Sequence, residues 1–267
     1  MSPKPGNPPP GMTTRHARVK LRLERARLGR MLRESWYRHV RSHIDHLVWS
    51  MWDRGWLRSD RVITERNACS HLGDMCLIEV PVSSITHYVL FGRDTPKRRF
   101  IWSGDWAERA LPFTSHHRYR MLEDIWQHRH DLESSETYRQ LLGRIHAAKP
   151  RVIANKNLYL DSPEAILHFL QMQADLFDSL SKHGIQRAMA PDDPTVAVGR
   201  DGQLYKTHKG RKRTAAARIL GLERMTVRIA YLHEHWVLKH RQPHHQRRSD
   251  TIRAALHALS TGKSHDT

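Results

Sequence analysis

The strongest structural signals in the chain lie in residues 195–231, which read TVAVGRDGQLYKTHKGRKRTAAARILGLERMTVRIAY. The apolar run 195–199 predicts a strand, and residues 204–207 predict the strand that returns beside it. Residues 200–203 (RDGQ) form the turn between them, in which Gly202 can adopt a positive φ. This first half of the stretch therefore predicts a β-hairpin.

The second half of the stretch leads from the hairpin through a basic loop into a helix. The alanine-rich residues 215–220 predict that helix, which Gly221 ends. Residues 225–231 are apolar and β-branched and predict a third strand. Two strands, a helix and a strand in this order predict an α+β fold built on a small mixed sheet.

The loop before the helix carries the residue types that bind phosphate. Free backbone N–H groups and the positive end of the helix dipole attract an anion to a helix start. A glycine lets the backbone approach a ligand closely, and a guanidinium group can donate two hydrogen bonds to one phosphate. A loop that is merely solvated is the alternative interpretation. The predicted phosphate-binding residues are Gly210, Arg211, Lys212, Arg213 and Thr214.

Several short motifs over residues 75–240 resemble the ParB/sulfiredoxin-like superfamily, and within it a group of ParB-like proteins. The matching residues are Arg200-Asp201-Gly202, Gly210-Arg211-Lys212-Arg213, the helix motif AAARILGL at 215–222, the later His233 and Trp236, and the upstream triplet Gly104-Asp105-Trp106. The motifs occur in the order of that group.

The resemblance implies a small domain whose glycine-basic loop and following helix hold nucleotide phosphates. Some relatives bind or hydrolyse CTP and clamp DNA, some transfer the γ-phosphate of ATP to a small acceptor such as free serine, and some act as nucleases. The implied cofactor is a nucleoside triphosphate, ATP or CTP, with Mg²⁺. The resemblance gives supporting roles at the site to Arg200, Asp201, His233 and Trp236.

The loop itself departs from the pattern of the group. Relatives commonly show Asp-Gly-Arg-His-Arg where this chain has Lys209-Gly210-Arg211-Lys212-Arg213. The lysines keep the positive charge that attracts an anion, but they cannot supply the oxygen ligands that Mg²⁺ prefers. The loop also lacks the cysteine that sulfiredoxin chemistry requires.

Phosphoryl transfer needs a carboxylate for the metal or for the acceptor hydroxyl, in addition to positive charge. The predicted catalytic carboxylates are Asp105 and Glu79, with Asp201 as a further candidate. Asp105 is favoured because it follows a predicted strand at 100–102 and lies between a glycine and a tryptophan. An aspartate that only caps a turn or a helix is the alternative interpretation of Asp105.

The chain divides by composition into four parts. Residues 1–13 are rich in proline and glycine and are expected to be disordered. Residues 14–70 read as a basic helical region, and 75–240 as the ParB-like domain with a helical insertion at about 107–185. Residues 241–267 read as a basic C-terminal tail that includes a short helix.

Two further elements are predicted from local signals. Residues 76–82 (CLIEVPV) read as a strand, and Pro81 favours a place at the edge of a sheet. Residues 163–183 give the clearest helix, with Ser162 as its N-cap, a proline in the first turn and Gly184 at its end.

The net charge of +18 is concentrated in two blocks. Residues 1–56 hold 12 Lys and Arg against 4 Asp and Glu, and residues 209–253 hold 12 against 3. Such blocks attract nucleic acid or another polyanion, although solvated helix faces are the alternative. No helix-turn-helix motif stands out, so sequence-specific reading of DNA is not predicted.

The remaining features exclude other classes. Cys69 and Cys76 are too few for a disulfide scaffold or a four-thiolate zinc site, and without a CxxC spacing they are interpreted as buried thiols. The histidines show no zinc-site spacing, so no metal site is predicted. No apolar run approaches the ~20 residues of a membrane span, and no signal peptide is recognised, so a cytoplasmic location is expected.

We therefore expect a nucleotide-dependent phosphotransferase of kinase type, or a nucleotide hydrolase, that acts on a small or sugar-like acceptor. The alternative is a ParB-like module that binds or cuts nucleic acid through the two basic blocks. A ParB-like domain with a purely structural role is a third hypothesis.

Overall fold

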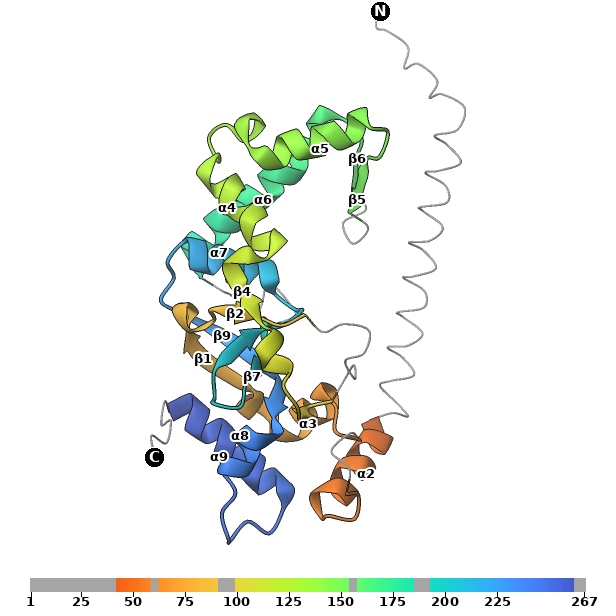
Figure 1. Ribbon diagram of the computed structural model, residues 1–267, viewed down its shortest axis with the longest axis vertical. Helices are drawn as coiled ribbons and strands as arrows, with labels where there is room; N and C mark the ends of the chain where they lie inside the picture. The colour runs from red at the N-terminus through yellow and green to blue at the C-terminus, as the bar shows by residue number, and fades with distance from the viewer. Residues whose placement is uncertain (1–41, 59–61, 91–98, 154–157, 185–192, 262–267) are drawn as a thin grey trace, which may run out of the picture.

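The computed structural model describes residues 42–58, 62–90, 99–153, 158–184 and 193–261 (Figure 1). Helices and one mixed sheet share these residues, so the predicted α+β class is confirmed. The expectations for residues 1–13 and for the helix before residue 42 lie outside the described residues. Among the described helices, none has both the length and the hydropathy needed to cross a bilayer.

A seven-stranded mixed sheet forms the centre of the described part of the chain. Its order is β1-β9-β7-β8-β2-β4, and β3 pairs with β9 on the side of β1. The strands are β1 (Leu77–Pro81), β2 (His87–Tyr88), β3 (Ile101–Trp102), β4 (Leu111–Pro112), β7 (Thr195–Val198), β8 (Leu204–Lys206) and β9 (Arg224–His233).

The predicted hairpin, helix and strand form the middle of this sheet. β7 and β8 are antiparallel, and α7 (Arg211–Ile219) crosses over from β8 to β9, which runs parallel to β7. The helix begins four residues earlier than predicted, because the basic residues form its first turn. β1 lies at one end of the strand order, as the proline at its end predicts.

The predicted insertion holds three helices and a small hairpin beyond α7. Figure 1 shows these helices at one end of the molecule, with α7 between them and the sheet. Ser162 Oγ caps α6 by accepting from the backbone N–H of Ala165 at 3.2 Å, as predicted. The elements are α4 (His117–Gln127), α5 (Glu136–His146), α6 (Pro163–His183), β5 (Arg151–Ile153) and β6 (Leu158–Leu160).

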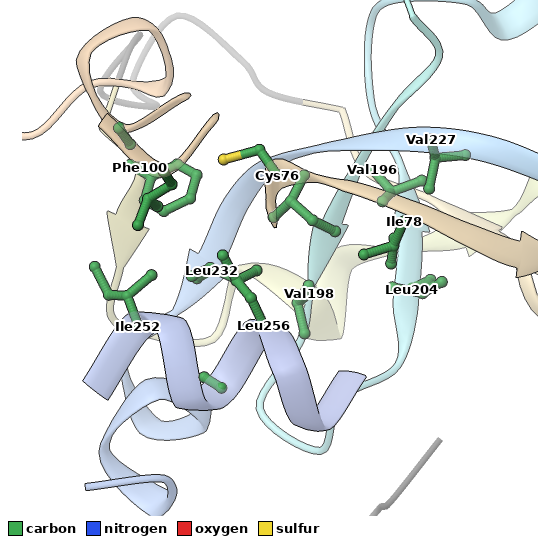
Figure 2. Packing of buried hydrophobic residues seen from close by; sticks show 14 of the residues in the cluster. Cys76, Ile78, Phe100, Val196, Val198, Leu204, Val227, Leu232, Ile252 and Leu256 are labelled. Carbon is green, nitrogen blue, oxygen red and sulfur yellow. The ribbon is translucent and has the colours of Figure 1, made fainter. Parts of the chain in front are cut away.

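Helices from both ends of the described chain cover the other end of the sheet. These helices are α2 (Ser42–Asp53), α3 (Glu65–Leu72), α8 (Glu234–Lys239) and α9 (Arg248–Thr261). Elsewhere in the described chain, short 3-10 turns occur at η3 (Gly73–Cys76), η4 (Val82–Ser84), η5 (Trp106–Arg109), η6 (Phe113–Ser115) and η7 (Leu132–Ser134). Figure 2 shows Ile252 and Leu256 of α9 against Val198 and Leu232 of the sheet.

Packing crosses the domain boundaries that the sequence suggested. Trp52 of α2 and Leu72 of α3 belong to the same buried cluster as the sheet, and so do Ile252 and Leu256 of α9. The described parts of 14–70 and 241–267 are therefore not separate from the sheet, because their apolar faces complete its core. The composition signal missed this because α2 itself holds no Lys or Arg, and Arg248 of α9 lies over the ring of Trp52 at 5.5 Å.

Candidate functional site: a cationic cluster at the start of α7

Gly210 begins α7 in a conformation that favours glycine. Its φ is +70°, and none of the described side chains caps this helix start. A Cβ placed on it would lie 2.5 Å from the Cα of Pro194. The close approach expected between the Gly210 backbone and a ligand is therefore made, in the described structure, to Pro194.

The basic residues of the first helical turn point in different directions. Arg211 Nε donates to the carbonyl oxygen of Thr207 at 3.0 Å, which holds the guanidinium beside the end of β8. Lys212 Nζ donates to Gln173 Oε1 of α6 and lies 5.6 Å from the centre of the Phe169 ring. Lys212 therefore joins α7 to α6, whereas Arg211 stays near the loop.

Thr214 and Arg213 complete the predicted loop. The buried Thr214 Oγ1 donates to the carbonyl oxygen of Gly210 at 3.2 Å, so this hydroxyl is used within the helix. Arg213 is partly buried and close enough to Lys206 to lower its pKa. Of the five predicted phosphate residues, the structure leaves Arg211 and Arg213 as the charged groups nearest to Lys206.

Lys206, at the end of β8, is a site residue that sequence reasoning missed. Its relative exposure is 0%, and its Nζ donates to the carbonyl oxygens of Thr195 at 2.7 Å, Thr207 at 3.4 Å and Lys209. Burial, followed by the charges of Arg211 and Arg213, lowers its pKa well below the usual value. Lys206 thus closes the loop onto β7 and places an amino group beneath the start of α7.

His116, the N-cap of α4, is the second residue that sequence reasoning missed. It is 2% exposed, and its Nδ1 accepts from the backbone N–H of Arg118 at 3.1 Å, which leaves the proton on Nε2. Burial and then the charge of Arg211, with further cations nearby, lower its pKa to about 4. None of the described residues accepts a hydrogen bond from Nε2.

These groups define a cationic cluster that joins the starts of α4 and α7 to the end of β8. Its members are Arg118, Lys206, Arg211 and Arg213, with His116 and His117. The charged neighbours that act most on the pKa values of Lys206 and His116 are all positive. Like charges held together in a partly buried place destabilise one another, and a bound anion would relieve that repulsion.

The predicted supporting residues meet at the opposite end of the β7–β8 hairpin. Arg200 Nη2 lies 3.5 Å from Asp105 Oδ1, with both side chains well exposed, and Asp201 Oδ1 accepts from the backbone N–H of Gln203 at 3.1 Å. A Cβ at position 202 would lie 2.7 Å from the Trp236 ring, so the turn packs directly on Trp236.

His233 ties this same end of the hairpin to the loop that contains Asp105. Its Nε2 donates to the carbonyl oxygen of Gly104 at 3.0 Å, and its Nδ1 accepts from the backbone N–H of His235 at 3.0 Å. Burial lowers its pKa, which suits a neutral ring with both nitrogens engaged. The upstream motif and the RDG turn are therefore brought together, but away from the loop at Gly210.

Neither predicted catalytic carboxylate lies in the cationic cluster. Asp105 is at the far end of the hairpin, and Glu79 lies on the edge strand β1, where its side chain is 62% exposed and pairs with Arg224 at 3.3 Å. The two carboxylates therefore do not combine with Arg211 into one catalytic centre. A short motif at Asp105, or a carboxylate in a predicted strand at Glu79, does not report where the fold places the side chain.

The donors of the cluster do not suit a divalent cation. Mg²⁺ takes oxygen ligands, and the cluster offers guanidinium, ammonium and imidazole groups. Within the described ranges, no group of three or more His, Cys, Asp or Glu side chains is placed to hold a metal ion. The cluster can therefore bind an anion directly, but it supplies no ligands for Mg²⁺.

Comparisons with known proteins gave no match to a family model, to a curated protein or to a solved structure.

Proposed function

We propose that the cationic cluster binds the phosphate groups of a nucleotide. The observation that carries this proposal is the placement of the buried Lys206 and His116 beside Arg211, with positive charges as their strongest charged neighbours. A cluster of this kind gains stability when an anion enters it. The α7 start adds backbone N–H groups and the positive end of its dipole.

Phosphate fits this cluster better than a carboxylate does. Arg211 can donate two hydrogen bonds to one phosphoryl group, and His116 Nε2–H provides a neutral donor. The resemblance to ParB-like proteins, with the fold that it implies, supports a nucleoside triphosphate such as ATP or CTP. In this proposal Arg211 and Arg213 bind the phosphate tail, while Lys206 and Gly210 shape the loop.

Hydrolysis or phosphoryl transfer remains a further step of the proposal. The carboxylates expected to perform it, Asp105 and Glu79, lie outside the cluster. For turnover, we propose that the carboxylate is supplied by the acceptor substrate or by another part of this chain.

Isothermal titration of the full-length chain with ATP, CTP, AMP and inorganic triphosphate tests the proposal. We expect ATP or CTP to bind, and Arg211→Met to weaken that binding about tenfold or more, since a hydrogen bond to a charged group contributes about 1.5–3 kcal/mol. Arg224→Met is the matched control, because it removes the same charge from an ion pair with Glu79 on β1.

Two results would overturn the proposal. One is the absence of measurable binding for every phosphate compound. The other is an equal loss of affinity in Arg211→Met and Arg224→Met, which would assign the effect to net charge. If inorganic triphosphate binds as tightly as ATP and CTP do, the cluster recognises the phosphate groups and not the base.

Nucleic-acid binding is a second candidate function, favoured by the two basic blocks of the sequence. In that case DNA or RNA would bind with an affinity that falls steeply as salt rises, because phosphate contacts release counterions. Arg211→Met and Arg224→Met would then have similar effects, and ATP or CTP would not compete. The same variants therefore separate the two functions.

A further inference from the structure

The two cysteines of the chain lie beside neighbouring residues of β9. Cys76 directly precedes Leu77, which pairs with Arg228, and Figure 2 shows Cys76 at the start of β1 beside β9. Cys69 lies on α3, with its Sγ 3.9 Å from the carbonyl oxygen of Ile229. The two cysteines belong to the same packed region of the core, and each lies close enough to act on the pKa of the other. The sequence did not predict that the two cysteines are neighbours, because they are seven residues apart and form no CxxC motif.

The two thiols have unequal surroundings. Cys69 is partly exposed, and its thiol donates to the carbonyl oxygen of Ile229 with Arg228 close by. The neighbouring Cys76 first, and Arg228 after it, lower the pKa of Cys69 despite its burial. Cys76 is fully buried, and its neighbour Cys69 together with burial raises its pKa. This is the arrangement of an accessible nucleophilic thiol with a buried partner thiol.

We infer that Cys69 and Cys76 form a dithiol that peroxide converts to an intramolecular disulfide. The inference is independent of the proposed nucleotide site, since it rests on α3, β1 and β9. Arg228, which also pairs with Asp193, would hold the Cys69 thiolate in position. Exposure and Arg228 select Cys69 as the attacking thiolate, and contact with it selects Cys76 as the resolving thiol.

The chemistry uses hydrogen peroxide as the oxidant. The Cys69 thiolate attacks one peroxide oxygen, the O–O bond breaks, and hydroxide leaves as Cys69 becomes a sulfenic acid. The Cys76 sulfur then attacks the Cys69 sulfur, the S–O bond breaks, and the thiol proton leaves with the hydroxyl group as water. In total, two thiols lose two electrons and two protons, and one peroxide is reduced to two waters.

Intact-mass measurement of the full-length protein tests the inference. Reduced protein is exposed to hydrogen peroxide, denatured and treated with N-ethylmaleimide. We expect wild type to take up no maleimide and to be lighter than the reduced chain by two hydrogen atoms. We expect Cys76→Ser to stop at a sulfenic acid on Cys69, which dimedone traps. We expect Cys69→Ser to keep Cys76 as a free thiol, which reacts with maleimide once the chain is denatured.

The role of Arg228 is tested by the rate of disulfide formation. Arg228→Met should slow it roughly tenfold, because the thiolate fraction falls tenfold for each unit by which the pKa of Cys69 rises. Arg224→Met, on the same strand and paired with Glu79, should leave the rate unchanged. Any of three results would overturn the inference: two maleimide-reactive thiols in oxidised wild type, a disulfide between two chains, or no dimedone adduct in Cys76→Ser. The cysteine variants keep the inference testable if Arg228→Met fails to fold.

Discussion

Two separate features of the fold require glycine at position 210. Its φ of +70° lies in the left-handed region, and Pro194 occupies the space that a side chain would need. Gly210→Ala should therefore lower the free energy of unfolding by about 2–4 kcal/mol, from backbone strain and overpacking together. Denaturant unfolding followed by circular dichroism measures this change.

Gly221 gives the matched control at the other end of α7. Its φ is +69°, but nothing lies within 4 Å of the position of an added Cβ. Gly221→Ala should carry the conformational cost alone, about 1–2 kcal/mol. Equal losses in the two variants would contradict the close packing of Gly210 on Pro194.

His116 should make stability depend on pH. Its pKa in the folded chain is about 4, against a usual 6.5, so between these values the unfolded chain binds a proton that the folded chain does not. The contribution of His116 to the free energy of unfolding should therefore rise with pH across this window and be lost as the pH falls towards 4.

His116→Asn should remove this part of the pH dependence. Asparagine can still accept the backbone hydrogen bond at the N-cap of α4, so the helix start is kept. Unfolding titrations of wild type and variant at several pH values compare the two slopes. Parallel curves would show that His116 is not buried as a neutral ring.

At the scale of elements, local signals in the sequence predicted what local physics controls. The cap at Ser162 and the glycine at position 184 gave both ends of α6, and Pro81 placed β1 at an edge. The strands β2, β4, β5 and β6 have two or three residues each, which is too short for an alternating pattern to show.

The candidate site was predicted in part, for a related reason. The loop at Gly210 has a local glycine-basic signature, whereas Lys206 lies in a strand that reads as ordinary, and His116 is distant in sequence. Only the packing of α4 against α7 brings His116 to Arg211. Contacts between distant elements of this kind are not visible in one sequence.

The link between α7 and α6 gives a prediction at the same scale. Lys212 donates to Gln173, which is 2% exposed, so Lys212→Met leaves a buried amide oxygen without this donor. We expect a loss of about 1–3 kcal/mol in the free energy of unfolding. Nucleotide affinity should fall less than in Arg211→Met, since Lys212 points towards α6. A larger effect on affinity than on stability would place Lys212 in the phosphate site instead.

At the scale of the whole molecule, the described chain is organised around β9. This strand pairs with β1, β7 and β3, and Cys69 of α3 lies against the carbonyl oxygen of its Ile229. The cationic cluster lies towards the helices α4 to α6, whereas α2, α3 and α9 close the other end of the core. Charge in the sequence located the basic regions, but burial determines which of them belong to the core.

The C-terminal helix tests this organisation. Ile252 and Leu256 of α9 are 0% and 1% exposed in the main core cluster, and Ser249 N–H donates to Asp53 of α2 at 2.8 Å. Leu256→Ala should lower the free energy of unfolding by about 3 kcal/mol, whereas Leu238→Ala, at a position that is 53% exposed, should change it by less than about 0.5 kcal/mol. Truncation after residue 247 should abolish cooperative unfolding, because the core would lose that whole face. A truncated chain that unfolds at the same denaturant concentration as the full chain would instead support a basic tail that is separate from the core.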